Sequence, residues 1–363
     1  MKIIVSAGGT GGHIYPALAI IEKFKEKEKN LEVLYIGTHN RMEKDIIPSR
    51  NIKYEALEIY GFSKTDIKRD IKNIFLINQA YKKCLKIMRE FKPDIVIGVG
   101  GYVTYPVIKA ANKLGIKTFI HEQNSIPGKS NIALSKKVDL IGISFEGSAE
   151  YFKKAMVKYT GNPCGEASIN AKLISKESLK LDPNKKLVLV VAGSLGSSTL
   201  NKTFKDFLKK VGSEDYEVLY ITGNSHYDSF VSNEKFPDNV KVIPYLDNLA
   251  GLMKNTDLMI TRAGASTMSE ILSLALPAIF VPSPYVANNH QYYNALELKN
   301  KNAALMIEEK DLNSEELIKE IKELLNNEKK YNEIKTNLKK ISINNSSEII
   351  YNSIKELIKW LKI

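Results

Sequence analysis

The sequence is poor in cysteine: its 363 residues include only Cys84 and Cys164. Two cysteines cannot form a disulfide framework, so we expect a chain that folds around hydrophobic cores in a reducing cytoplasm. No apolar run reaches the roughly 20 residues that a membrane-spanning helix needs. Residues 1–6 lead straight into a glycine loop, which leaves no room for the apolar region of a signal peptide. The sequence therefore predicts a globular protein.

Metal ligands are also sparse. The five histidines are dispersed along the chain, and no Asp-x-Asp pair stands at the end of an expected strand. A zinc site needs clustered histidine or cysteine side chains. We therefore expect no metal and no cofactor.

The length and the charge set further limits. A chain of 363 residues is too long for one ordinary core and suits two domains. The formal net charge is +12, which fits nucleic acid, an anionic membrane, a polyanionic substrate or simply a lysine-rich composition. The lysines are scattered, and no basic stripe carries interleaved aromatic residues, so nucleic acid is disfavoured.

Residues 262–270 form the most informative stretch. They follow an apolar run, residues 257–261, that predicts a buried strand, and they lead into residues 271–275, which predict a helix. At this turn Gly264 lets a ligand approach the backbone, and the N–H groups of the first helical turn have no partners within the helix. Such a turn favours a phosphate group.

Glu270 lies one helical turn beyond this phosphate-binding turn. Its carboxylate would repel a phosphate, but it can accept two hydrogen bonds from a ribose diol. In the alternative interpretation, Ser269 and Glu270 only complement the dipole of the helix. The stretch by itself leaves both interpretations open.

A second strand, glycine loop and helix stand at the start of the chain. Residues 3–5 predict a buried strand, residues 7–13 are glycine-rich, and residues 16–20 begin an amphipathic helix. The glycines are denser than in a dinucleotide fingerprint, and no Gly-Lys-Ser/Thr follows. A redox enzyme and a P-loop enzyme are therefore both disfavoured.

The same alternation of strands and helices recurs along the chain. It predicts two α/β domains, each Rossmann-like with a doubly wound parallel sheet, that face each other across a cleft. Ligands of such sheets bind at the carboxyl ends of the strands, where the glycine loops and the polar residues 121–124 are expected. The further predicted strands are residues 34–37, 94–102, 117–120, 187–191, 218–221, 240–243 and 278–282.

We expect the first domain over residues 1–162 and the second over residues 163–345. Residues 192–197 repeat the glycine-loop pattern after the first strand of the second domain. The tail, residues 346–363, predicts an amphipathic helix that either caps the second domain or crosses back to the first.

Residues 67–87 combine apolar residues with several lysines at helical spacing. This pattern is typical of a helix that lies on an anionic membrane. It also fits a helix that packs on a core and exposes a basic face to water.

The glycine-rich and polar motifs, in their order and spacing, closely resemble the MurG family. This is a family of bacterial GT-B glycosyltransferases that move GlcNAc from UDP-GlcNAc to undecaprenyl-pyrophosphoryl-MurNAc-pentapeptide (lipid I) to make lipid II in peptidoglycan synthesis. The resemblance runs from the first strand to about Asn294. The motifs that carry it are residues 8–13, 100–102, 121–124, 161–163, 193–194 and 262–270.

The resemblance implies that the second domain binds the nucleotide sugar. Glu270 would hold the ribose hydroxyls, and Leu246 would lie against the uracil. Residues 265–269 with Ser194 would hold the diphosphate, and Gln291 would contact the sugar. The implied donor-binding residues are Thr10, Gly11, Gly12, Asn124, Ser194, Leu246, Arg262, Ala265, Ser266, Thr267, Met268, Ser269, Glu270, His290 and Gln291.

The resemblance also implies an inverting displacement, in which the C4 hydroxyl of MurNAc needs a base. His13 is the candidate base, and Glu122 is the second candidate. In the alternative interpretations, His13 hydrogen-bonds the loop or a phosphate, and Glu122 is a buried carboxylate paired with His121. The acceptor's pyrophosphate would lie near Gly8, Gly9, Gly100, Gly101 and Tyr102.

A lipid-linked acceptor favours the membrane interpretation of residues 67–87. The resemblance then implies a peripheral enzyme on the cytoplasmic face of the cell membrane, with a cell-wall synthesis complex as a further candidate partner. The residues expected in the membrane patch are Lys72, Ile74, Phe75, Leu76 and Lys82.

The sequence departs from the family at two positions. Cys164-Gly165 stands where the family usually has an arginine that meets the donor phosphates, and Leu195 replaces a frequent glutamine. Loss of a guanidinium could remove roughly 1.5–3 kcal/mol of hydrogen bonding, unless Arg262 or a lysine substitutes. Other GT-B transferases, a UDP-sugar 2-epimerase and a non-catalytic binding subunit are the competing hypotheses.

Overall fold

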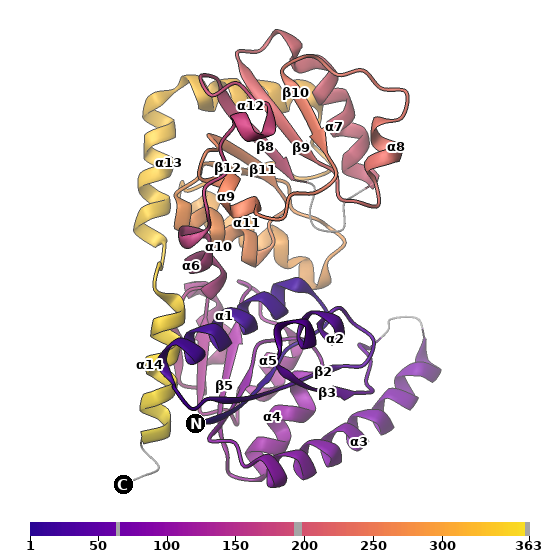
Figure 1. The fold of residues 1–363 in the computed structure, drawn as a ribbon, viewed down its shortest axis with the longest axis vertical. Helices are drawn as coiled ribbons and strands as arrows, with labels where there is room; N and C mark the ends of the chain where they lie inside the picture. The colour runs from indigo at the N-terminus through magenta and orange to yellow at the C-terminus, as the bar shows by residue number, and fades with distance from the viewer. Residues whose placement is uncertain (63–65, 192–197, 360–363) are drawn as a thin grey trace. The chain divides into compact units, whose positions relative to one another are not determined.

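The computed structural model describes residues 1–62, 66–191 and 198–359. The chain divides into two compact units (Figure 1). Unit 1 comprises Met1–Cys164 and Asn345–Ile363, and unit 2 comprises Gly165–Asn344. The glycine loop expected over residues 192–197 lies outside the described residues.

Unit 1 contains a seven-stranded sheet in the order β3-β2-β1-β4-β5-β6-β7, and all the pairings are parallel. The order reverses between β1 and β4, where the loops after the two strands diverge and leave room for a ligand. The strands are β1 (Lys2–Ser6), β2 (Glu32–Thr38), β3 (Lys53–Leu57), β4 (Ile95–Gly98), β5 (Lys117–Glu122), β6 (Leu140–Ile143) and β7 (Val157–Tyr159).

Alternating side chains of these strands fill a separate core on each face of the sheet. Ile3 and Val5 belong to one core together with Ile350 of the last helix, whereas Ile4 belongs to the other core together with Leu76. Because successive residues of a strand point to opposite faces, a continuous apolar run can bury both sides of the sheet. This explains why the strands have no polar alternation.

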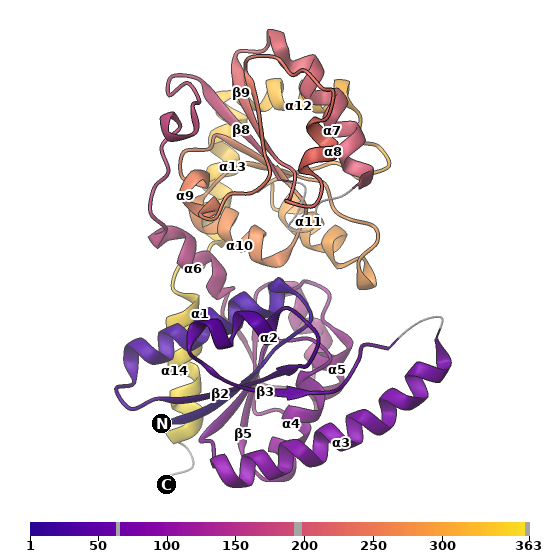
Figure 2. The same cartoon turned by 45° about the vertical axis from the view of Figure 1, so that its right-hand side comes forward.

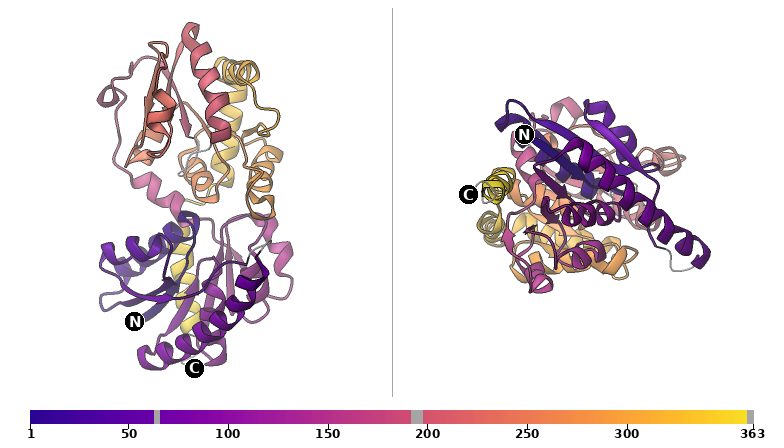
Figure 3. Two further views of the ribbon diagram at one scale, coloured as in Figure 1. Left: turned by 90° about the vertical axis from the view of Figure 1, so that its right-hand side faces the viewer. Right: turned by 90° about the horizontal axis from the view of Figure 1, so that it is seen from below.

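In unit 1 the last helix of the chain, α14, packs beside the first helix, α1 (Figure 2). Tyr351 contacts the ring of Phe24 edge-on, and its hydroxyl donates to Glu28 at 2.7 Å. Figures 1 and 3 show the long helix α3 running along α4. The helices are α1 (Gly11–Lys27), α2 (Glu43–Ile46), α3 (Ile67–Phe91), α4 (Thr104–Lys113), α5 (Lys129–Leu134) and α14 (Ser346–Lys359), with 3-10 turns at Pro48–Arg50 and Glu146–Phe152.

Unit 2 contains a six-stranded parallel sheet in the order β10-β9-β8-β11-β12-β13. Its order reverses between β8 and β11. The strands are β8 (Lys186–Val191), β9 (Tyr216–Ile221), β10 (Val240–Ile243), β11 (Leu258–Thr261), β12 (Ala278–Phe280) and β13 (Leu305–Met306). The predicted α/β class with two parallel sheets is therefore confirmed.

Helices flank this sheet as they flank the first. They are α6 (Pro163–Asn170), α7 (Ser198–Lys210), α8 (Tyr227–Val231), α9 (Leu249–Met253), α10 (Ala265–Leu274), α11 (His290–Asn300), α12 (Ser314–Asn326) and α13 (Glu328–Ile341), with 3-10 turns at Glu177–Leu179, Val211–Ser213 and Ala287–Asn289.

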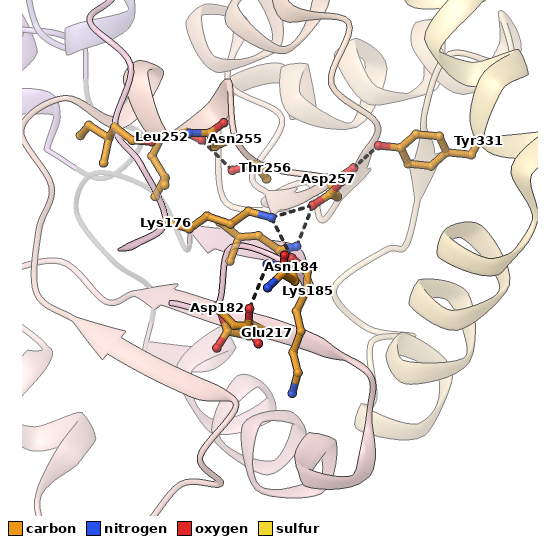
Figure 4. Close-up of polar contacts among 12 residues, drawn as sticks. Lys176, Asp182, Asn184, Lys185, Glu217, Leu252, Asn255, Thr256, Asp257 and Tyr331 are labelled. Atoms are coloured by element: carbon orange, nitrogen blue, oxygen red, sulfur yellow. Dashed lines mark hydrogen bonds and ion pairs between the residues drawn. The ribbon is translucent and has the colours of Figure 1, made fainter. Parts of the chain in front are cut away.

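A polar network closes the amino end of this sheet (Figure 4). The Asp257 carboxylate accepts from the backbone N–H of Leu187 at 2.8 Å and from Lys176 Nζ at 3.5 Å. Tyr331 of α13 donates to the Asp257 carbonyl at 2.9 Å. These groups satisfy one another's hydrogen-bonding capacity. Ligands of parallel sheets bind at the opposite, carboxyl end of the strands.

Candidate functional site

The turn after β11 presents the uncapped start of a helix. Helix α10 begins at Ala265, and its N-cap residue, Gly264, makes no side-chain hydrogen bond. A Cβ atom added to Gly264 would meet nothing within 4 Å, so the turn is open on that side. Uncapped N–H groups together with the helix dipole make this end of α10 a place for an anion.

Glu270 has no hydrogen-bond or ion-pair partner in the part of the chain that the structure describes. It lies in the second turn of α10, and burial raises the pKa of its carboxyl group to about 7. A carboxylate that is largely removed from water without a compensating partner costs free energy. Such a group indicates a binding site whose ligand supplies the missing hydrogen bonds.

The neighbouring residues of α10 divide between ligand-facing and structural positions. The Ser266 hydroxyl oxygen is buried and has no partner among the described residues. The Ser269 hydroxyl donates to the Ser266 carbonyl at 2.6 Å, and the Met268 side chain is fully buried. Ala265 and Thr267 are partly exposed. Met268 can therefore offer a ligand only its backbone.

Arg262 was expected to contact the donor, but its side chain pairs with Glu309. Its Nη1 atom lies 2.7 Å from Glu309 Oε2 and donates to the Val281 carbonyl at 3.1 Å. Both charged side chains are about nine-tenths buried. A buried guanidinium that is already paired serves the packing of β11, β12 and the segment after β13. The hypothesis that Arg262 replaces the missing family arginine loses its support.

Helix α11 is tied to the same turn. Asn294 Nδ2 donates to the Ala263 carbonyl at 3.2 Å. At the start of the helix, Gln291 Oε1 accepts from the Ser283 N–H at 2.9 Å, so only the Gln291 amide nitrogen is considered as a donor to a ligand. His290 Nδ1 lies 2.8 Å from the Ala287 carbonyl. Leu246 is half-buried in the segment between β10 and α9, and the expected residues Ser194 and Leu195 lie outside the described ranges.

In unit 1 the two glycine loops meet at the point where the strand order reverses. Gly8 N–H donates to the Gly100 carbonyl at 3.3 Å. Gly100 and Gly101 have φ angles of 99° and 88°, which favour glycine. A Cβ atom at Gly101 would also clash with the Gly8 carbonyl. The loops after β1 and β4, with Gly9 and Tyr102, therefore form one continuous surface.

His13 lies in the first turn of α1 and is held by this surface. Its Nδ1 atom is 3.0 Å from the Gly8 carbonyl oxygen. A carbonyl only accepts, so Nδ1 carries the hydrogen and Nε2 is the accepting nitrogen of the neutral ring. A Cβ atom at Gly100 would lie 2.5 Å from His13 Cδ2, so the glycine makes room for the imidazole. Thr10 is the N-cap residue of α1, and Gly11 and Gly12 are the first two residues of that helix.

Glu122 is a buried carboxylate at the end of β5 that holds the following loop. It accepts from the N–H groups of Asn124 at 2.9 Å and Gly128 at 3.0 Å, and from Asn131 Nδ2 at 2.8 Å. The predicted alternative, a pair with His121, is wrong. Asn124 Nδ2 donates to Glu122 as well, at 3.4 Å. With these donors in place, Glu122 is suited to shaping the loop that carries Asn124.

His121 has its own buried partners. Its Nε2–H donates to the Gly161 carbonyl at 2.9 Å, and Gln123 Nε2 donates to its Nδ1 at 3.0 Å. Burial lowers the pKa of His121 to about 4. The ring is therefore neutral at physiological pH and fixes the backbone at Gly161.

Sequence reasoning gave no role to Glu43, which the structure buries fully beside the first glycine loop. Its carboxylate accepts from Gly9 N–H and from Thr38. A single glutamate in a short helix carries no sequence pattern, so only the folded arrangement reveals it.

The exposed face of α3 is apolar and basic. Ile67, Ile71, Ile74 and Phe75 are 75, 55, 59 and 67% exposed. Lys72 and Lys82 are also exposed. Among the described residues no helix is long and apolar enough to cross a membrane.

Leu76 does not belong to this face, so its place in the predicted patch is wrong. It is only 8% exposed and packs in the core with Ala80, Cys84 and Met88. These residues follow one another at intervals of four, which puts them on the buried side of the helix.

Within residues 1–62, 66–191 and 198–359, no group of three or more His, Cys, Asp or Glu side chains is arranged to hold a metal ion.

Two family models match the chain, one mainly in each unit. Residues 3–143 match the glycosyltransferase family 28 N-terminal domain, and residues 187–350 match the family's C-terminal domain. The two parallel-sheet units and these matches define a glycosyltransferase with the GT-B fold.

Similarity to individual proteins identifies a narrower family within this class of glycosyltransferases. The UDP-N-acetylglucosamine–N-acetylmuramyl-(pentapeptide) pyrophosphoryl-undecaprenol N-acetylglucosamine transferase of Bacillus cytotoxicus is 41% identical over 363 residues, which cover 99% of this chain and 100% of the relative. The crystal structure of Acinetobacter baumannii MurG superposes with a TM-score of 0.80 at 26% identity, over 98% of this chain and 99% of that one. The chain belongs to this family of N-acetylglucosamine transferases.

A wider likeness concerns the fold alone. The UDP-GlcNAc 2-epimerase of Neisseria meningitidis, solved with UDP-GlcNAc, has a TM-score of 0.69 at 15% identity, over 98% of this chain and 100% of that one.

Proposed function

We propose that the protein is an inverting transferase that moves GlcNAc from UDP-GlcNAc to the C4 hydroxyl of MurNAc in lipid I, which yields lipid II for peptidoglycan. One structural observation carries the donor assignment: the unpartnered Glu270 carboxylate lies behind the uncapped start of α10. A ribose diol offers two O–H donors to such a carboxylate, while the diphosphate fits the helix start. Membership in the family supplies the acceptor.

In this proposal, unit 2 binds the donor. The N–H groups of Ala265, Ser266 and Thr267 and the Ser266 hydroxyl hold the diphosphate, and Glu270 holds the ribose. The Gln291 amide nitrogen contacts the sugar hydroxyls, because its oxygen is occupied by Ser283. The backbone near Leu246 contacts the uracil. His290 and Ser194 remain proposed donor residues.

The proposed reaction is a single displacement at the anomeric carbon of GlcNAc. The acceptor oxygen forms the new bond as the bond to the UDP oxygen breaks, and the acceptor proton goes to the base. Negative charge develops on the departing diphosphate, where the positive end of α10 stabilises it. Both substrates keep their oxidation states.

His13 suits the base better than Glu122 does. The Gly8 carbonyl fixes the hydrogen on Nδ1, which makes Nε2 the atom that takes the acceptor's proton. Glu122, in contrast, already accepts four hydrogen bonds from Asn124, Gly128 and Asn131. We therefore propose that Glu122 orients Asn124 and that His13 acts as the base.

The acceptor's pyrophosphate would bind to the joined glycine loops of unit 1. The backbone around Gly8, Gly9, Gly100 and Gly101 has no Cβ atoms to hold a ligand away, and Tyr102 borders it. The first turn of α1 has no acidic residue and no side-chain cap. A second anionic group is therefore well placed there.

The exposed face of α3 would bring the enzyme to its lipid substrate. Four apolar side chains stand among lysines on this face, which is typical of a helix that lies in the headgroup region of an anionic membrane. The enzyme would then act at the cytoplasmic face of the cell membrane, where a cell-wall synthesis complex is a further proposed partner.

Transfer of labelled GlcNAc from UDP-GlcNAc to a short-chain lipid I analogue tests the proposal. Wild type should form the disaccharide lipid. Glu270→Ala should raise the donor KM about tenfold or more, since it removes charge-assisted hydrogen bonds. His13→Ala should lower kcat by roughly 100-fold or more. Met156→Ala, at an exposed position of unit 1, is the control and should match wild type.

Two results would contradict the proposal. If wild type bound UDP-GlcNAc but transferred no sugar to the lipid I analogue, the protein would be a transferase for another acceptor or a binding subunit. Conversion of UDP-GlcNAc at C2 without any acceptor would indicate an epimerase.

A further inference from the structure

Glu43 is an acidic residue buried without a counter-charge. It begins the short helix α2 and has no exposed surface. In the part of the chain that the structure describes, no lysine, arginine or histidine forms an ion pair with it. A carboxylate in such surroundings carries a desolvation cost, which needs a reason in the fold or in the function.

The Glu43 carboxylate accepts three hydrogen bonds. Oε1 accepts from the Thr38 N–H at 3.1 Å and from the Thr38 hydroxyl at 2.6 Å, and Oε2 accepts from the Gly9 N–H at 3.3 Å. Three donors suit the carboxylate form, which only accepts. Two aromatic side chains enclose the site: burial and then the Glu43 charge raise the pKa values of Tyr35 and Tyr54.

The Gly9 N–H belongs to the same peptide group as the Gly8 carbonyl. The described chain has no cis peptide bond, so the N–H and the C=O of this group point in opposite directions. The N–H donates to Glu43 Oε2, and the carbonyl accepts from His13 Nδ1. One peptide group therefore connects the buried carboxylate to the imidazole.

We propose that Glu43 is a positioning residue that acts on His13 through the Gly8–Gly9 peptide group. The carboxylate orients the peptide by holding its N–H, and the peptide orients the imidazole by accepting Nδ1–H. Hydrogen bonds in such a chain polarise one another, so the negative charge makes the Gly8 carbonyl a stronger acceptor. A stronger acceptor at Nδ1 makes Nε2 a better base.

The choice of glycine at position 8 supports this arrangement. A Cβ atom at Gly8 would clash with Glu43 Oε1. The loop therefore admits the carboxylate only because residue 8 has no side chain. The space at position 8 serves the buried glutamate as well as any ligand of the loop.

Few other ionisable groups reach this loop among the described residues. Tyr102 borders Gly9 from the loop after β4, and Tyr15 lies in the next turn of α1 against Gly11. Thr10 Oγ1 lies 3.5 Å from His13 Nδ1 but does not ionise in this range. Glu43 is the carboxylate that contacts the loop directly.

The effect on catalysis rests on the proposed function, whereas the effect on the imidazole does not. Two measurements separate them. In the transfer assay, Glu43→Gln should lower kcat about tenfold with an unchanged donor KM, and the acidic limb of the pH profile of kcat/KM should move to lower pH. A purely structural tether would lower the unfolding midpoint without moving that limb.

NMR of histidine labelled with nitrogen-15 reads the imidazole itself. His13→Gln identifies the His13 signals among the five histidines. His13 of wild type should show the Nδ1–H tautomer, and His13 of Glu43→Gln should titrate at lower pH than in wild type. Thr38→Val removes a competing donor from the carboxylate, so its His13 should titrate at higher pH than in wild type.

Tyr54→Phe is the matched control. It deletes a partly buried hydroxyl that donates to the Thr38 carbonyl at 2.5 Å beside the same carboxylate, but it leaves the Gly9 contact in place. It should lower stability and leave the titration unchanged.

The proposed role of Glu43 is wrong if His13 is the Nε2–H tautomer in wild type. It is also wrong if His13 titrates as in wild type both in Thr38→Val and in a folded Glu43→Gln. If the His13 titration shifts as expected but wild type transfers no GlcNAc, the role of Glu43 stands and the proposed function fails. If Glu43→Gln does not fold, the wild-type tautomer and the direction of the Thr38→Val shift decide.

Discussion

A Cβ atom added to Gly165 would lie 2.6 Å from the backbone oxygen of Ser269. Helix α6 thus approaches α10 so closely at this point that only glycine fits. The same addition would clash with the Ser273 hydroxyl. The arginine that the family resemblance leads one to expect shortly after Gly-Asn-Pro has no room at position 165 in this packing, which gives the expected departure a physical reason.

Gly165→Arg should therefore weaken the protein instead of improving donor binding. Overpacking against a backbone oxygen should lower the free energy of unfolding by about 1–3 kcal/mol. Urea unfolding measures this loss, and calorimetry with UDP measures affinity. Ala167→Arg adds the same side chain at an exposed position of α6 and should change stability by less than about 0.5 kcal/mol. Tighter UDP binding by a fully stable Gly165→Arg would contradict this account.

Glu270 should make the protein less stable as the pH rises. Its pKa is raised to about 7 by burial, from an ordinary value of 4.5. The folded state holds a proton that the unfolded state has lost in this window, so stability is fully present below about pH 4.5 and is lost as the pH rises through about 7. The total change is of order 1–3 kcal/mol.

The comparison of wild type with Glu270→Gln isolates this effect. Thermal unfolding from pH 5 to pH 8 should show that the stability of wild type relative to the variant falls across that range. UDP should bind wild type more tightly at the upper end, because the ionised carboxylate is the better acceptor for the ribose. Parallel pH profiles of the two proteins would show that Glu270 is not desolvated.

His121 should act in the opposite direction. Burial lowers its pKa from 6.5 to about 4, so the unfolded state binds a proton that the folded state refuses. Its contribution to stability is present above about pH 6.5 and is lost as the pH falls towards 4. His121→Gln cannot take up that proton and should flatten this acid dependence in urea unfolding at pH 4 to 7. An equally steep dependence in the variant would assign it to other groups.

Phe75→Asp should reduce binding to anionic vesicles about tenfold or more, since a largely exposed ring would otherwise enter the lipid. Co-sedimentation measures the binding. Transfer to a short-chain, soluble acceptor should not change, because such an acceptor does not have to be reached at a membrane surface. Met156→Asp, another exposed apolar position of unit 1, is the control and should bind as wild type does. Full vesicle binding by Phe75→Asp would remove α3 as the docking face.

Much of the fold follows from local sequence patterns. Short apolar runs followed by glycine predicted β1, β4 and β11 and the turns that follow them, because strand burial and the glycine requirement of a tight turn are both written into neighbouring residues. Strands β3, β6, β7 and β13 were not predicted. They are short or partly polar, and their pairing with other strands decides their structure.

The sequence by itself determined the α/β class, the places of the glycine turns and the family, since ordered motifs carry that information without a structure. Only the tertiary structure decided which side chains face one another. Arg262 meets Glu309, Leu76 turns into the core, and Glu43 reaches the Gly8–Gly9 peptide group. The partners of these residues lie on other elements of the chain, and parallel strands bring such elements together only through long crossover connections.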